Sequence, residues 1–121
     1  MGAGTSFSML RTLGEAYKVG QLQGQRLPAL RGFYLATLGG ARALRLDDRI
    51  GNFATGKEAD FIVLDPAATA LLARRMRGAS TLEERLFAWM ILGDERAVSE
   101  TYVLGMLARP RAAVPRGTSQ A

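Results

Sequence analysis

The side chains in this sequence considered for chemistry are carboxylates and hydroxyls, and its 121 residues include no histidine and no cysteine to assist them. Asp60 stands directly before an apolar run. A buried carboxylate there would have a shifted pKa and could act as an acid or a base. Hydrogen bonds from nearby turn amides, or an ion pair with Lys57 or Arg42, would also hold a carboxylate at this position. We favour this structural role for Asp60 over a catalytic one.

The remaining candidates lack the partners that their chemistry needs. Ser6 and Ser8 have no histidine to activate them as nucleophiles, which excludes the Ser-His route. Asp47 and Asp48 are adjacent, and a site for a hard cation needs more carboxylates than two neighbours in a turn provide. The glycine spacing also fits neither phosphate-binding pattern. The sequence therefore predicts no catalytic residue and no metal ligand.

The elements that would position these side chains begin with helices. Apolar residues recur at helical spacing after the small residues at the start, and Thr5 or Ser6 could cap the resulting helix. Gly24 should end it, and Pro28 suits the first turn of a second helix. A glycine pair, at 39 and 40, should break or tighten that helix. The predicted segments are residues 6–23, a helix from Pro28, and a short helix over 40–44.

A strand follows over residues 59–65, because four consecutive apolar residues predict a strand that is covered on both faces. Gly56 supplies the turn before it. Further on, Thr81 and Glu84 have the spacing of a capping box and predict a helix that ends near Gly93. The other predicted elements are a helix over 67–77, two strands within 97–107 around a turn at Leu104 and Gly105, and a disordered tail from Arg109 onward.

One apolar stripe of the helix that begins at Thr81 contains the sequence's single tryptophan. Such a stripe is more often core than a groove for a partner, and Trp89 should be its largest buried anchor. The stripe consists of Leu82, Leu86, Trp89 and Met90.

Two stretches taken together resemble the final part of metal-dependent amidohydrolases: GKEADFIVLD at 56–65 and ATLGGARAL at 36–44. TSFSMLRTLGEAYKV at 5–19 is similar to the guanine deaminase branch. The resemblance runs from about residue 2 to about 105. It implies a mixed α/β fold, with C-terminal helices of a (βα)8 barrel and C-terminal strands of a flanking β-sandwich. We expect a fragment of a larger fold: barrel helices in 1–49, sandwich strands with inserted helices in 50–108, and a tail in 109–121.

The resemblance also implies an activity, the hydrolytic deamination of guanine to xanthine and ammonia at zinc or another divalent metal. In the family, histidines on earlier strands and an aspartate hold the metal, and that aspartate would stand one residue before Met1. We therefore expect a fragment, opened at an alternative start codon or cut there, that has no cofactor and is inactive alone. Thr5 and Phe7 match a loop at the mouth of the metal pocket and could line the guanine site. Helix capping and core packing are the simpler roles for both. Gly56, Asp60 and Trp89 are expected to be structural.

Composition limits the partners. The chain has 48% apolar residues, enough for one core, and no apolar run near the ~20 residues that span a bilayer. Its net charge of +5 is spread out, and the basic clusters contain no aromatic residues for stacking on bases. We expect a cytoplasmic protein with no nucleic-acid or membrane partner. In a fragment, the helix over 6–23 and the strand over 59–65 would lose the partners that cover them, which predicts a homo-oligomer. The alternative is a non-catalytic assembly module that pairs with a separate barrel or with itself.

Overall fold

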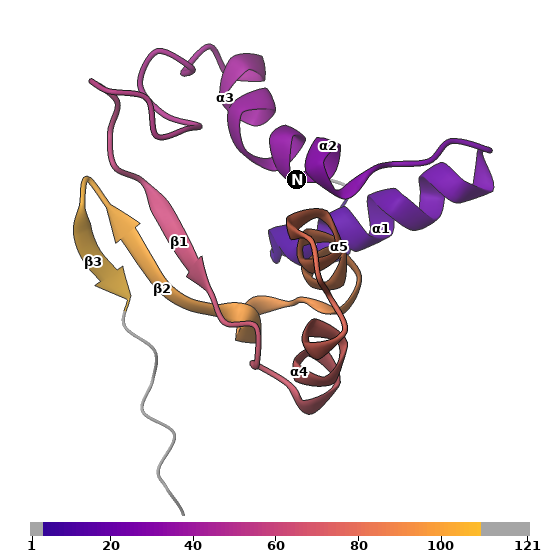
Figure 1. Cartoon of the computed structure of the whole chain (residues 1–121). Coiled ribbons are helices and arrows are strands. Elements are labelled where there is room, and N and C mark those ends of the chain that lie inside the picture. Colours follow the sequence, from indigo (N-terminus) through magenta and orange to yellow (C-terminus); the bar gives the residue numbers. More distant parts are fainter. Residues whose placement is uncertain (1–3, 110–121) are drawn as a thin grey trace, which may run out of the picture.

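The computed structural model describes residues 4–109, and it has the mixed α/β composition predicted from the sequence. Figure 1 shows helices grouped around α5 (Leu82–Leu92) on one side and a three-stranded antiparallel sheet on the other. The strand order in the sheet is β1 (Phe61–Leu64), β2 (Val98–Val103) and β3 (Met106–Arg109). The predicted disordered tail began at Arg109, which was wrong for Arg109 itself, because it is the last residue of the third strand; the rest of the predicted tail lies outside the described residues.

The first helix, α1, spans Met9–Leu22. Its cap is Ser8, whose Oγ accepts a hydrogen bond from the backbone N–H of Arg11 at 3.4 Å. The prediction of Thr5 or Ser6 as the cap was therefore wrong. The physical reason is local: the Oγ of Ser6 accepts the N–H of Ser8 instead, at 3.0 Å, so the helix begins after that turn. Gly24 follows the helix with a φ of +70°, which favours glycine and agrees with the predicted end.

The second helical stretch is continuous, where the sequence indicated a helix from Pro28 and a separate short helix over 40–44. It consists of α2 (Ala29–Tyr34), a π-helical segment, η1 (Leu35–Gly39), and α3 (Gly40–Ala43), with Pro28 as the residue before it. The prediction that Gly39 and Gly40 break or tighten the chain was wrong, because both keep helical dihedral angles with φ of −63° and the helix continues through them. The chain widens here instead. A Cβ at Gly39 would lie 3.1 Å from the carbonyl oxygen of Tyr34, so glycine suits the close packing of the π turn.

Two helices precede the last strands, α4 (Ala70–Arg77) and α5 (Leu82–Leu92). The predicted capping box of α5 is confirmed: Thr81 Oγ1 accepts the N–H of Glu84 at 3.2 Å, and Glu84 Oε2 accepts the N–H of Thr81 at 3.2 Å. A short 3-10 turn, η2 (Glu95–Ala97), leads from α5 to the sheet.

The core lies around α5, between α1, α2 and α4. Met90 and Leu72 are its largest fully buried side chains. Trp89 was predicted to be the largest buried anchor, which was wrong, because it is only partly buried at the edge of the core. Its Nε1–H instead donates to the carbonyl oxygen of Asp65 at 3.4 Å, at the end of β1. The buried apolar residues form two clusters: Leu10, Leu72, Ala88 and Ala97, and Leu13, Ala29 and Met90.

The sheet consists of β1 (Phe61–Leu64), β2 (Val98–Val103) and β3 (Met106–Arg109). Leu104 and Gly105 form the predicted turn between β2 and β3, both with positive φ, as a type I′ two-residue hairpin requires. The apolar run of β1 predicted a strand covered on both faces. Within residues 4–109 this was wrong, since Ile62 and Val63 are 50% and 38% exposed. The helices pack at one end of the sheet rather than across its faces (Figure 1).

Candidate functional site

The segment that leads into α1 carries the two residues predicted to lie near a substrate pocket. Thr5 lines a shallow hollow of about 410 Å³ between the start of α1 and the end of α5, together with Arg11, Glu15 and Lys18. Phe7 does not line this hollow, and its side chain is fully exposed, at 111%. The structure therefore separates the two. Neither Thr5 nor Phe7 packs in the core.

The residues before β1 hold the hairpin of β2 and β3. Gly56 has a φ of +91° in the turn that precedes them. Asp60 is exposed rather than buried, and its Oδ1 accepts the backbone N–H of Leu104 at 2.8 Å. Next to it, the carbonyl oxygen of Ala59 accepts the N–H of Gly105 at 2.9 Å. A hydrogen bond of this kind, from a turn amide to a carboxylate, stabilises the hairpin turn.

The most buried carboxylate was not singled out from the sequence. Asp94, 7% exposed, lies directly after α5 and is bonded to Arg96, whose Nε donates to Oδ1 at 3.0 Å and whose Nη2 donates to Oδ2 at 2.7 Å. The pKa of Asp94 is lowered, first by the side-chain hydrogen bonds of Arg96, against the opposing effect of burial. An acid next to an arginine two positions later, after a helix-ending glycine, is the signal that could have found it.

No group of three or more metal-binding side chains occurs in the described part of the chain. The printed sequence also contains neither histidine nor cysteine. Zinc in proteins is held mostly by imidazole, thiolate and carboxylate ligands, usually three or four together. Residues 4–109 therefore do not fit a zinc site, and no catalytic step can be assigned to them through a metal.

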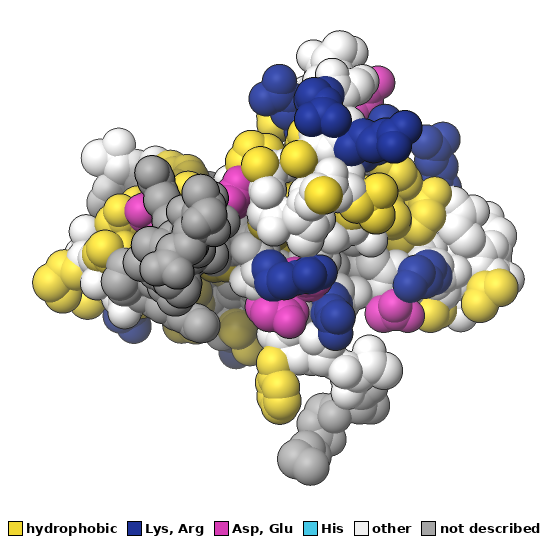
Figure 2. Space-filling view, turned by 90° about the horizontal axis from the view of Figure 1, so that it is seen from below, with side chains coloured by type: hydrophobic (Ala, Val, Ile, Leu, Met, Phe, Trp, Pro, Cys, Tyr) yellow, Lys and Arg dark blue, Asp and Glu magenta, His cyan; other side chains and the backbone are white. Residues whose placement is uncertain are grey.

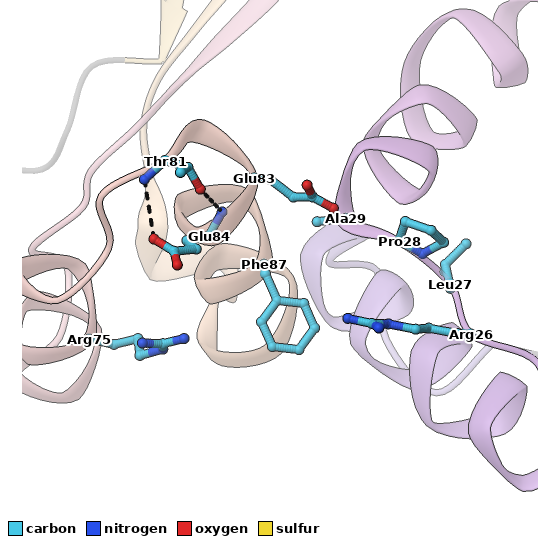
Figure 3. A pocket seen from close by; sticks show the side chains of 9 residues that line it. All are labelled: Arg26, Leu27, Pro28, Ala29, Arg75, Thr81, Glu83, Glu84 and Phe87. Carbon is cyan, nitrogen blue, oxygen red and sulfur yellow. Dashed lines mark hydrogen bonds between the residues drawn. The ribbon is translucent and has the colours of Figure 1, made fainter.

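A second hollow, of about 350 Å³, lies between the segment before α2 and the first turns of α5. Arg26, Arg75 and Phe87 line it, each from a different part of the chain. Figure 3 shows the two arginine side chains directed toward the Phe87 ring from opposite sides. The sequence offered no sign of this arrangement, because residues 26, 75 and 87 are far apart along the chain.

Comparison with known proteins identifies the family of the chain. The model of the "Amidohydrolase family" matches residues 1–108. The chain belongs to the amidohydrolase family. Guanine deaminase from Escherichia coli (strain K12) is 58% identical over 92% of this chain, and a probable guanine deaminase from Deinococcus radiodurans is 40% identical over 87% of it.

Solved structures agree with this assignment. The structure of E. coli guanine deaminase matches 92% of this chain with a TM-score of 0.88, and that of guanine deaminase from Bradyrhizobium japonicum matches 90% of it with a TM-score of 0.80 at 36% identity. These findings confirm the fold class and the resemblance to the guanine deaminase branch.

The chain spans only part of these relatives. It covers 25% of the length of each of the two curated relatives, and 26% and 29% of the two solved chains. Among the described residues, no helix is long and apolar enough to cross a membrane.

Proposed function

We propose that this amidohydrolase chain forms part of a guanine deaminase, which hydrolyses guanine to xanthine and ammonia. One observation carries the proposal: the match to E. coli guanine deaminase, 58% identical with a TM-score of 0.88. Residues outside this chain would hold the zinc or other divalent metal, because residues 4–109 offer no suitable ligand group. The chain alone is then inactive.

The contribution of the chain would be structural support and one edge of the substrate pocket. Thr5 and Phe7 precede α1, and Phe7 is free to contact another part of the enzyme or the purine, since its side chain is fully exposed. Residues 1–49 would belong to the barrel, and residues 50–108 to the flanking sandwich. The exposed faces of β1 would then pack against the rest of that sandwich. Gly56, Asp60 and Trp89 would be structural.

We also propose that the isolated chain self-associates. Large apolar side chains such as Leu22 and Phe53 are 88% and 83% exposed, and such surface favours association. Figure 2 shows apolar side chains spread over several parts of one face. Light scattering that finds only monomer at high concentration would argue against this. A cytoplasmic location, without nucleic-acid or membrane partners, completes the proposal.

Complementation tests the function. The purified chain is mixed with the part of E. coli guanine deaminase that it does not match, and ammonia release from guanine is measured with zinc present. We expect no turnover by either part alone and turnover by the mixture. Binding between the two parts without turnover would favour the alternative, a non-catalytic assembly module. Turnover by the chain alone, with stoichiometric zinc, would refute the proposal.

A further inference from the structure

The turn between β2 and β3 carries an exposed apolar tip, residues 103–107, with the sequence VLGML. The four side chains of this tip are all apolar, and each is about half exposed or more. Figure 1 shows the turn at the end of the sheet away from α5, so the helical core does not cover it. The exposed fractions are 47% for Val103, 59% for Leu104, 68% for Met106 and 47% for Leu107.

Leu104 holds a backbone conformation that leucine avoids. Its φ is +52°, in the left-handed region, and a bulky residue with positive φ is an outlier. A type I′ turn prefers asparagine, aspartate or glycine at this position, because these residues adopt the conformation at low cost. Local turn chemistry therefore does not account for a leucine here. A residue kept in an unfavourable backbone conformation points to a function of its side chain.

Two hydrogen bonds fix the tip from the segment before β1. Asp60 Oδ1 accepts the N–H of Leu104 at 2.8 Å, and the carbonyl oxygen of Ala59 accepts the N–H of Gly105 at 2.9 Å. Both bonds use the backbone of the turn and leave the Leu104 side chain exposed. The fold therefore presents this side chain in a fixed direction, and a surface that is fixed before contact loses less freedom when it binds.

Apolar side chains lie on both faces of the hairpin. Val103 pairs with Met106 on one face. Leu107 pairs with Tyr102 on the other face, because neighbouring residues of a strand point to opposite sides of the sheet. A flat partner would cover only one of these faces. The tip therefore fits an apolar recess that surrounds it.

The size of the tip limits what can cover it. Four side chains that are about half exposed offer on the order of 200 Å² of apolar surface, whereas a stable complex of two separate proteins buries about 800 Å² on each partner. A contact of this size suits two bodies that other contacts already hold together. The proposed deaminase supplies such a body, since this chain spans 25% of the length of its two curated relatives.

From these observations we propose that the tip is a docking surface, and that Leu104 and its neighbours insert into an apolar recess on the part of the deaminase outside this chain. The inference rests on the proposed function, which supplies that partner. The contact joins the last hairpin to the remainder of the enzyme and has no part in the chemical step.

Replacement of Leu104 by asparagine separates docking from backbone strain. Asparagine adopts positive φ more readily, so Leu104→Asn should raise the thermal unfolding midpoint of the isolated 121-residue chain by a few degrees. The second protein is a chimera, in which residues 1–108 replace the matching segment of E. coli guanine deaminase. There the substitution should lower the midpoint, because it places an amide in an apolar recess. A rise of the midpoint in both proteins would overturn the proposal.

Arg45→Asn is the matched control. Arg45 lies shortly after α3, is exposed and has a φ of +57°, so its replacement relieves the same kind of strain away from the tip. We expect it to raise the midpoint of both proteins. If Arg45→Asn lowers the midpoint of the chimera as much as Leu104→Asn does, the loss is not specific to the tip and the proposal is wrong.

The isolated chain also tests the other possible occupants. A lower midpoint in its Leu104→Asn variant, or a smaller mass by light scattering, would mean that this chain itself covers the tip, and would overturn the proposal. Guanine turnover by the chimera is measured separately. An active chimera without the opposite signs would refute the docking contact alone. A folded, inactive chimera with the opposite signs would refute the proposed function and support the contact.

Discussion

The carboxylate of Asp60 accepts the backbone N–H of Leu104 at 2.8 Å, across 44 positions of sequence. The bond ties the residue before β1 to the turn between β2 and β3. The bond gives the acid that precedes this apolar strand a partner in the hairpin.

Removal of this carboxylate should loosen the hairpin. We expect Asp60→Ala to lower the free energy of unfolding by about 1 kcal/mol, because the Leu104 N–H loses its acceptor at an exposed site where water can replace it. Denaturant titration measures the change. Asp48→Ala is the control, since Asp48 is exposed and makes no hydrogen bond or ion pair within the described residues. An equal loss of unfolding free energy in both variants would contradict the role of Asp60 in stabilising the hairpin.

The crossing of α1 and α5 depends on a glycine. A Cβ at Gly14 would lie 2.9 Å from the carbonyl oxygen of Met90, and this oxygen belongs to helix backbone that cannot move aside alone. Gly14→Ala should therefore destabilise the chain by about 1–3 kcal/mol, despite the better helix propensity of alanine. Thermal unfolding followed by circular dichroism tests this.

Gly78→Ala is the matched control for that measurement. A Cβ at Gly78 would lie 3.7 Å from the nearest oxygen, an ordinary contact, and φ there is −91°. A stability change of Gly14→Ala no larger than that of Gly78→Ala would show that the two helices do not pack as closely as described.

Asp94 should make the stability of the chain depend on acid pH. Its pKa in the folded state is below the ordinary value, chiefly because Arg96 donates hydrogen bonds to it. Its contribution is therefore fully present above the unfolded-state pKa of about 3.9 and is lost as the pH falls through the folded-state value.

Asp94→Asn should remove part of this acid sensitivity, with the remainder due to other carboxylates. Urea unfolding of both proteins at neutral pH and at about pH 3 gives the loss of unfolding free energy between the two pH values. If this loss is the same in the variant as in the original chain, Asp94 is not the group responsible.

The sequence predicted those elements whose signals are local. The capping box of Thr81 and Glu84, the end of α1 at Gly24, and the hairpin at Leu104 and Gly105 depend on neighbouring residues, and all three are present. The predicted break at Gly39 failed because the helix continues there as a π turn, in which the absence of a Cβ avoids a close contact with Tyr34.

Long-range features were harder to predict. The apolar run of β1 indicates a buried strand, but burial depends on what covers the sheet, and residues 4–109 leave Ile62 half exposed. The placement of Arg26 opposite Arg75 results from the packing of α4 and α5 beside the start of α2, which no local pattern encodes. The role of Asp94 likewise depends on burial.

The proposed function is tested most directly by a single chimera. Residues 1–108 of this chain replace the matching segment of E. coli guanine deaminase, and kcat/KM for guanine is measured against the unmodified enzyme and against the same enzyme with that segment deleted. We predict activity within about tenfold of the unmodified enzyme, a difference of at most about 1.4 kcal/mol in the barrier. A soluble, zinc-loaded chimera no more active than the deletion would contradict the proposed function.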